Sequence, residues 1–539
     1  MVRRRAMGAR TILVAGSAVM VTACGLTVSP NGQTGSSTTL GSTTSTGQTD
    51  ALGQPVAPPS GPADATTTGP SDTSQPGQPV APIGGVPNAP TVPTTGGGGT
   101  SAPGGSRPTA HGGGIPTQAA SSTAASSIIP AKGHGWDQKY IYIGLTTIKD
   151  FDQSVGTLGL SLSAGDQQGD AEAIVNAMNK AGGVFGRQIK LVVKDTKTAD
   201  AEANTDGAAQ TLCTYFTQDA AVVGVLVDGP FDTENFRSCM TKGKVPYSIL
   251  TSNYGWDDQA GNENLPYMSN PSAASWNRVL PVFIKRLQAQ NYFQSWNTIS
   301  GGPGGTAPPV VGVIYSNANA ADIRIGKLMD AAFRGAGYKT VPFEYQSQAD
   351  FQNGVINFRQ NGVTHVVGTD EGPFYFATVA QTQSYHPRYG LTTIQALNPL
   401  WESNGQAAQN NGAVGIGWEP GLDVNTQNDP GGRAGTAWCL KALADGGQTF
   451  APSARFAEFV GFVYCDALRL YVMGAQAGGG LDPQSIVKGW VKLGTSFPVA
   501  GPFTSGLTMT NLGLPGAARD VHYDNACACF KYSGPTYPL

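Results

Sequence analysis

Charged side chains are scarce in this chain, and neither sign dominates. Asp, Glu, Lys and Arg make up 13% of the 539 residues, and the formal net charge is −3 at pH 7. No basic stripe runs along the chain, so the electrostatic footprint that nucleic-acid binding requires is missing. We therefore expect no nucleic-acid partner.

Motifs typical of enzymes are also missing. From residue 136 on, the chain has no phosphate-binding Gly-Lys-Ser/Thr loop, no Gly-x-Gly-x-x-Gly after a predicted strand and no Gly-x-Ser-x-Gly elbow. Three of the five histidines, His365, His386 and His522, lie there, and none has metal-ligand spacing with Cys or carboxylates. We expect no catalytic residues, no cofactor and no metal site. A hydrolase on a doubly wound sheet would need a nucleophile–base pair that the sequence does not show.

Long apolar runs are absent except near the N-terminus. Arg3–Arg5 precede an apolar stretch from Thr11 to Val21, which is too short for a permanent membrane span. The stretch leads to Thr22-Ala23-Cys24-Gly25, which resembles a bacterial lipobox. We expect residues 1–24 to be a lipoprotein signal peptide with lipidation at Cys24. The alternative is an ordinary secretory signal in which Cys24 is incidental.

Residues 25–135 contain mainly Ser, Thr, Gly, Pro and Ala, with few charges and few large apolar side chains. Such a segment buries too little apolar surface to offset the entropy of ordering. We expect a disordered tether between the lipid anchor and a folded head.

From residue 136 to the end, predicted strands alternate with predicted helices in two similar series. Apolar strands over 139–145, 189–193, 221–227 and 245–250 are separated by helical patterns, and the alternation restarts at 310–315. Alternation of this kind predicts parallel sheets covered by helices. The predicted fold is α/β, with two doubly wound parallel-sheet lobes. We place lobe 1 at 136–270 plus 399–499 and lobe 2 at 271–398 plus 500–539.

Seven cysteines occur, and six of them follow the signal region. An even set in an exported protein indicates disulfides, although six cysteines allow fifteen pairings. The local pairs Cys213–Cys239 and Cys439–Cys465 are favoured because each would link neighbouring elements of one lobe. A bond between Cys527 and Cys529 would be strained, so free thiols or another pairing remain alternatives.

One run of residues carries a family resemblance. Ala173–Arg187 reads Ala-Ile-Val-Asn-Ala-Met-Asn-Lys-Ala-Gly-Gly-Val-Phe-Gly-Arg and is followed by a strand ending at Asp195. This run resembles the N-terminal signature of type I periplasmic binding proteins, in the leucine/isoleucine/valine-binding branch. Val223–Leu226, Val245–Ser248 and Val310–Gly335 also fall where that family has equivalents.

The resemblance implies two lobes joined by three crossing segments, with a solute held in the cleft between them. The crossings map near 268–271, 397–400 and 498–503. The pair Cys213–Cys239 also resembles a first-lobe disulfide of that family. The implied function is capture of a small polar solute, such as an amino acid or an amide, for an ABC importer.

Candidate ligand-binding residues lie in the loops that follow the predicted strands, because ligands of open parallel sheets bind beyond the carboxyl ends of the strands. The candidates are Phe151, Asp228, Gly229, Thr251, Ser252, Asn253, Asn319, Asp370, Glu371 and Asn398.

In relatives, hydroxyls and backbone amides in such loops bind the carboxylate of the solute, and Thr251–Asn253 match that character. Asp228 stands where a serine is usual and would repel a carboxylate. Together with Asp370 or Glu371, it favours a cationic, amide or polyol solute. Two alternatives stay open: Asp228 as the cap of the helix beginning near Asp232, and Glu371 as a solvated loop acid. Phe151, Tyr254, Trp256, Phe374 and Trp401 are aromatic candidates for cleft lining, with rim packing as the alternative for each.

These predictions describe a monomeric, lipid-anchored solute-binding protein on the outer face of the cytoplasmic membrane, with an ABC permease complex as partner. An envelope receptor that senses a ligand on the same fold is the alternative, because both functions need the same cleft and hinge.

Overall fold

The structure is a computed structural model that describes residues 129–250, 256–264 and 266–539. Cys24 and Thr251–Asn253 lie outside this part of the chain, as do Tyr254, nearly all of the predicted tether and the whole predicted signal peptide.

In the described residues, the first sheet has five parallel strands in the order β2–β1–β3–β4–β5. Its strands are β1 (Tyr140–Ile148), β2 (Gln188–Thr196), β3 (Gly224–Val227), β4 (Tyr247–Ile249) and β5 (Met268–Ser269). Helices of the same lobe are α2 (Phe151–Thr157), α3 (Gln167–Lys180), α4 (Thr198–Thr214), α5 (Glu234–Gly243), α6 (Asp258–Asn264), α13 (Thr436–Asp445), α14 (Arg455–Gly478) and α15 (Pro483–Leu493).

The second sheet has seven strands in the described residues, in the order β14–β13–β12–β11–β10–β8–β9. They are β8 (Val310–Ser316), β9 (Lys339–Tyr345), β10 (His365–Gly368), β11 (Arg388–Thr392), β12 (Val414–Gly417), β13 (Ala517–Asp524) and β14 (Cys529–Pro538). The strands from β8 to β12 pair in parallel, whereas β13 and β14 are antiparallel. This lobe also has α7 (Trp276–Ala289), α8 (Ala320–Gly335), α9 (Phe351–Gln360), α10 (Gly372–Thr382), α11 (Ala407–Asn410) and a small hairpin of β6 (Trp296–Asn297) and β7 (Gly302–Pro303).

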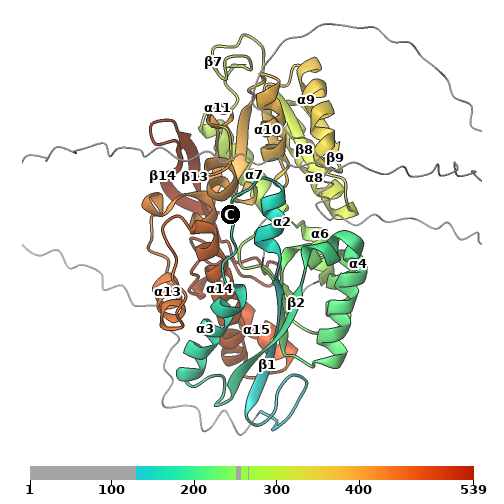
Figure 1. The fold of residues 1–539 in the computed structure, drawn as a ribbon, viewed down its shortest axis with the longest axis vertical. Helices are drawn as coiled ribbons and strands as arrows, with labels where there is room; N and C mark the ends of the chain where they lie inside the picture. Colours follow the sequence, from blue (N-terminus) through green and yellow to red (C-terminus); the bar gives the residue numbers. More distant parts are fainter. Residues whose placement is uncertain (1–128, 251–255, 265) are drawn as a thin grey trace, which may run out of the picture. The chain divides into compact units, whose positions relative to one another are not determined.

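Helices pack on their own sheets: α3 contacts β2, and α8 contacts β8 and β9 (Figure 1). The prediction of two doubly wound α/β lobes is therefore confirmed.

The glycine-rich stop after α3 has a steric cause. Gly183 has a φ of +63°, and a Cβ atom there would lie 2.0 Å from the carbonyl oxygen of Arg187. Only glycine fits this position without rearrangement. The turn lets Val184 and Arg187 pair before the chain enters β2.

The predicted boundary at residue 399 is wrong. β12 lies between β11 and β13 of the second sheet, so residues 399–417 belong to lobe 2. The crossing expected near 397–400 instead follows β12, where α12 (Pro420–Asp423) contacts both α14 and the π-helical turn Leu397–Glu402. A short apolar strand carries no local signal for which of two sheets it will join.

Trp418 connects the segments that cross between the lobes. Its indole nitrogen donates to the carbonyl of Ser272 at 2.9 Å, and its own carbonyl accepts from the amide of Phe503 at 3.2 Å. Asn270 in turn forms a parallel bridge with Gly513. The three crossing segments are thus hydrogen-bonded to one another around one fully buried ring.

Disulfides join Cys213 to Cys239 and Cys439 to Cys465, which confirms both predicted pairs. Cys527 and Cys529 are also bonded to each other, contrary to the expectation that strain would disfavour this bond. They lie at the turn between β13 and β14, where the intervening Ala528 has a φ of +52°.

Candidate functional site

The parallel strands of both sheets follow the same order. In β2–β1–β3–β4–β5 and in β9–β8–β10–β11–β12, the first strand along the chain lies between the second and the third. Connections from the first and third strands therefore leave on opposite faces and open a crevice at the carboxyl edge, which is where ligands of such sheets bind. The crevice falls after β1 and β3 in lobe 1, and after β8 and β10 in lobe 2.

Asp228 lies directly after β3, at the crevice of the first lobe, and is 7% exposed. Its amide donates to the hydroxyl of Thr146 at 2.8 Å, and its carboxylate accepts from the side-chain amide of Gln167 at 3.3 Å. The side chain that caps α5 is Thr233, which accepts from the amide of Phe236. The alternative of Asp228 as the cap of this helix is therefore wrong. Gly229 follows in a short 3-10 turn.

Asn319 caps α8 in the second lobe. Its side-chain oxygen accepts from the amide of Asp322 at 2.9 Å, and its side-chain nitrogen donates to the carboxylate of Asp322, also at 2.9 Å. The side chain thus has a structural role at the edge of the crevice.

Asp370 and Glu371 form an acidic edge after β10. The carboxylate of Asp370 accepts from the amides of Ser316 at 3.1 Å and Gly372 at 2.8 Å, so it connects the end of β8 to the start of α10. Burial raises the pKa of Asp370. Burial and the neighbouring Asp370 raise the pKa of Glu371 to about 8 and that of Asp322 to about 7. At neutral pH this edge therefore carries fewer negative charges than its three carboxyl groups suggest, and Glu371 is half-buried rather than a solvated loop acid.

The other described candidates lie in packed positions. Asn398 is 6% exposed within the turn Leu397–Glu402, and its carbonyl accepts from the amide and hydroxyl of Ser403. The ring of Phe151 stacks on Phe456 of α14 with 5.7 Å between centroids, so it packs within the first lobe. Trp401 is fully buried against Tyr389.

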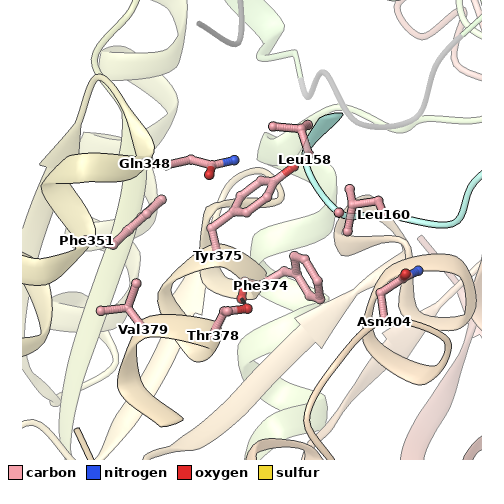
Figure 2. Close-up of a pocket in the computed structure, with 10 residues that line it drawn as sticks. Leu158, Leu160, Gln348, Phe351, Phe374, Tyr375, Thr378, Val379 and Asn404 are labelled. Atoms are coloured by element: carbon pink, nitrogen blue, oxygen red, sulfur yellow. Dashed lines mark hydrogen bonds between the residues drawn. The ribbon is translucent and has the colours of Figure 1, made fainter. Parts of the chain in front are cut away.

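A cavity of about 210 Å³ is lined by residues of both lobes. The first lobe contributes the turn after α2, and the second contributes the start of α9 with the turn before it, several turns of α10, and Asn404. The lining residues are Leu158, Gly159, Leu160, Gln348, Phe351, Phe374, Tyr375, Thr378, Val379 and Asn404. Figure 2 shows Tyr375 extending from α10 toward Leu158, with Phe351 on one side and Phe374 on the other. Of these residues, sequence reasoning had singled out only Phe374.

No side chain that lines this cavity is ionic at neutral pH. Burial and the nearby Glu371 raise the pKa of Tyr375, which keeps its phenol neutral. Asn404 accepts from the amide of Ser161 at 3.1 Å and donates to the carbonyl of Pro399, so its amide connects the two lobes. The cavity therefore suits an apolar or aromatic group with neutral polar substituents.

An ion pair also crosses between the lobes. Arg324 of α8 donates from Nε to one carboxylate oxygen of Asp257 at 2.5 Å and from a terminal nitrogen to the other at 3.1 Å. Asp257 lies just before α6 in the first lobe and is 4% exposed.

Comparison with solved structures identifies the fold. The chain matches a leucine-binding protein of Thermotoga maritima with a TM-score of 0.51 and 12% identity, over 74% of this chain and 99% of that one. The chain has the type I periplasmic binding fold. A branched-chain amino acid ABC transporter protein of Thermus thermophilus with bound valine matches this fold with a TM-score of 0.51 and 11% identity, over 74% and 96% of the two chains. A solute-binding protein of Rhodopseudomonas palustris in complex with 4-hydroxybenzoate matches it with a TM-score of 0.52 and 13% identity, over 74% and 97%.

No protein-family model matches the chain, and no curated protein sequence matches it either. Within the described part of this type I fold, no group of three or more His, Cys, Asp or Glu side chains is arranged to hold a metal ion. No helix among residues 129–250, 256–264 and 266–539 has the length and apolar character of a membrane span.

Proposed function

We propose that this chain is an extracytoplasmic solute-binding protein that captures a small polar solute between its lobes for an ABC importer. The observation that carries the proposal is the pair of crevices at equivalent positions of two sheets with the same strand order. Two such edges on either side of a hinge can close on a ligand. Solved proteins of the same fold that bind valine or 4-hydroxybenzoate support the assignment.

The solute that we propose is an amino acid, an amide or a similar small molecule, with an apolar or aromatic part. The cavity beside α10 would hold that part, because its lining is aromatic and uncharged at neutral pH. Thr251–Asn253, Asp228 and the acidic edge after β10 would meet the polar part, and the raised pKa of Glu371 allows that carboxyl to donate a hydrogen bond. On this proposal the chain acts as a receptor and not as an enzyme.

The proposal includes export and lipid anchoring at Cys24, with a tether that ends at residue 128. The tether is shorter than the predicted 25–135, because Ile129 is 7% exposed and the carbonyl of Pro130 accepts from the side chains of Trp136 and Arg187. It also includes an ABC permease complex as partner and a monomeric state. The basic and apolar N-terminal segment before Cys24 and the composition of the tether support export and anchoring. Similarity in fold to a solute-binding protein of an ABC transporter supports the permease partner.

A thermal-shift screen of the full chain tests solute capture. Probes are valine, leucine, acetamide, 4-hydroxybenzoate, glycerol and putrescine, each titrated from micromolar to millimolar concentration. A solute at 100 times its Kd stabilises the folded state by about 2.7 kcal/mol. Absence of any shift across these classes would contradict the assignment.

A matched pair of variants locates the site. Thr378→Trp fills the cavity from the exposed side of α10, and Thr382→Trp places the same ring one turn further along that helix, at an exposed position. The first variant should weaken the thermal response at least tenfold in solute concentration, while the second keeps it. Equal responses would place the solute elsewhere. Uptake of the labelled solute is then compared between cells with and without the gene for this protein. Loss of uptake without the gene indicates import, and unchanged uptake indicates sensing.

A further inference from the structure

The disulfide between Cys527 and Cys529 differs from the other two in its exposure and in the length of chain that it closes. Cys527 is exposed at the turn between β13 and β14, and neither of the other two disulfides has an exposed cysteine. The bond encloses a single residue, because its cysteines have a sequence separation of 2, whereas the separation is 26 in each of the other pairs. A thiol in solution can therefore reach Cys527 while the protein stays folded.

The short loop makes this bond the easiest of the three to open. A disulfide constrains the unfolded chain less when the loop that it closes is shorter. Ala528, the residue inside the loop, has a φ of +52°, in the left-handed region that is unfavourable for a residue with a Cβ atom. Strained or exposed disulfides are the ones that thiols reduce most readily. The bond between Cys527 and Cys529 has both properties.

A hydrogen-bond donor is aimed at the buried sulfur of the pair. Cys529 is 3% exposed, and its Sγ accepts from the side-chain amide of Asn428 at 3.2 Å. The same amide donates to the carbonyl of Phe530 at 3.4 Å, and the side chain of Asn425 accepts from the backbone amide of Asn428 at 3.1 Å, so the donor is held in place. A hydrogen bond to a charged form favours that form, so Asn428 offsets the cost of negative charge on this buried sulfur.

The surroundings of the exposed sulfur are different. Sγ of Cys527 lies 3.6 Å from the carbonyl oxygen of Asp524 and 3.8 Å from that of Cys529. Carbonyl oxygens carry partial negative charge and disfavour a thiolate beside them. When the bond breaks, negative charge therefore forms more readily on Cys529, while Cys527 is the sulfur that an incoming group can reach.

We propose that the bond between Cys527 and Cys529 is a thiol–disulfide exchange site, with a thiol as its substrate, Cys527 as the attacked sulfur and Cys529 as the leaving group. The thiolate bonds to Sγ of Cys527, and the electron pair of the broken bond goes to Sγ of Cys529, which takes a proton from water. A second thiolate attacks the first thiol's sulfur in the mixed disulfide and releases Cys527, which is protonated in turn. Two thiols are thus oxidised to one disulfide, and the protein disulfide is reduced to two thiols. The reverse exchange with an oxidised thiol restores the bond.

Differential alkylation of the folded full chain tests the site. The protein is incubated with dithiothreitol or reduced glutathione without denaturant and quenched with iodoacetamide, and mass spectrometry then quantifies the label on each cysteine. We expect Cys527 and Cys529 to be reduced at least about tenfold faster than either of the other pairs. The mixed disulfide trapped with glutathione should lie on Cys527, with the label on Cys529. Equal rates for the three disulfides, no reduction of this pair in the folded protein, or glutathione on Cys529 would overturn the proposal.

A matched pair of variants tests the donor. Asn428→Ala removes the amide beside the leaving sulfur and should slow reduction by dithiothreitol about threefold or more. Asn525→Ala removes another amide of the same hairpin, which donates to Asn411 and not to a sulfur, and should keep the rate. Loosening of the hairpin alone would speed reduction, so a slower rate reports the lost donor. An unchanged or faster rate in Asn428→Ala would overturn the assignment of Cys529 as the stabilised leaving group. The proposal does not rest on solute capture for an importer, so either can fail alone.

Discussion

Glu419 is a buried carboxyl among the segments that cross between the lobes, and its burial should make the stability of the protein depend on pH. It follows Trp418 in the second crossing segment, is 0% exposed, and has no hydrogen-bond partner for either carboxylate oxygen among the described residues. A Cβ atom at Gly501 of the third crossing segment would lie 2.7 Å from one of these oxygens. Burial raises the pKa of Glu419 well above its usual value, with Asp466 adding to the shift and Arg433 opposing it.

The magnitude follows from proton linkage. A carboxyl whose pKa is raised on folding makes its full contribution below the unfolded-state pKa and loses it as pH rises toward the folded-state pKa. The loss in the free energy of unfolding is about 1.4 kcal/mol for each pH unit in that range. Glu419→Gln removes this dependence and keeps the shape of the side chain. From pH 5.5 upward the variant should therefore gain about 1.4 kcal/mol per pH unit relative to the wild type, until the pH reaches the folded-state pKa.

Urea unfolding of both proteins at half-unit pH steps measures this difference, and Glu263→Gln at an exposed position of α6 is the control. The quantity to compare is the change with pH, because the amide also alters the absolute stability. If the difference between variant and wild type stays constant over this range, Glu419 is ionised in the folded protein and the reasoning is refuted.

Three further predictions concern the contacts that join elements distant in sequence. Trp418→Phe leaves the carbonyl of Ser272 without its donor and should lower the free energy of unfolding by about 1–3 kcal/mol in urea titrations; no loss would mean that the crossing segments do not depend on this bond. Replacing Cys439 and Cys465 by Ser should lower the free energy of unfolding by about 3.5 kcal/mol, from the loop-entropy relation for a separation of 26 residues. The same replacement at Cys527 and Cys529, which are 2 residues apart, should lower it much less. Equal losses would argue against loop entropy as the cause. Arg324→Gln should destabilise the protein by about 1–3 kcal/mol at pH 7 and by less at pH 3. The reason is that the pKa of its partner Asp257 is lowered, because the effect of burial is outweighed by hydrogen bonds from Arg324 and a backbone amide, so the ion pair is lost as Asp257 becomes protonated in acid. A loss that does not change with pH would contradict an ionic contribution.

The sequence by itself determined the order of the elements and the fold class. Alternating apolar strands and amphipathic helices are local patterns, since burial of one face fixes a period of two or of 3.6 residues within a few turns. The glycine-rich stop after α3 was equally local, because Gly183 meets a carbonyl only four residues away. The two disulfides with a separation of 26 residues also joined neighbouring elements and could be chosen from the sequence.

Tertiary structure alone decided the features that depend on distant partners. β12 is equally apolar whichever sheet it joins, and its pairing with β11 and β13 moved residues 399–417 to the second lobe. The interlobe cavity brings Leu158 against the start of α10, more than 200 residues away in the numbering, and no local pattern records that contact.

The burial of acidic side chains follows the same rule. Asp170 and Glu419 read as ordinary polar positions in the sequence, but each lost its solvent when a helix or crossing segment far along the chain packed against it. Solvent exposure and pKa depend on everything that surrounds a group, whereas hydrophobic periodicity depends only on its own segment. For that reason the order of elements and the fold class could be predicted from the sequence. The tertiary structure alone decided which acidic side chains are buried and which have a shifted pKa.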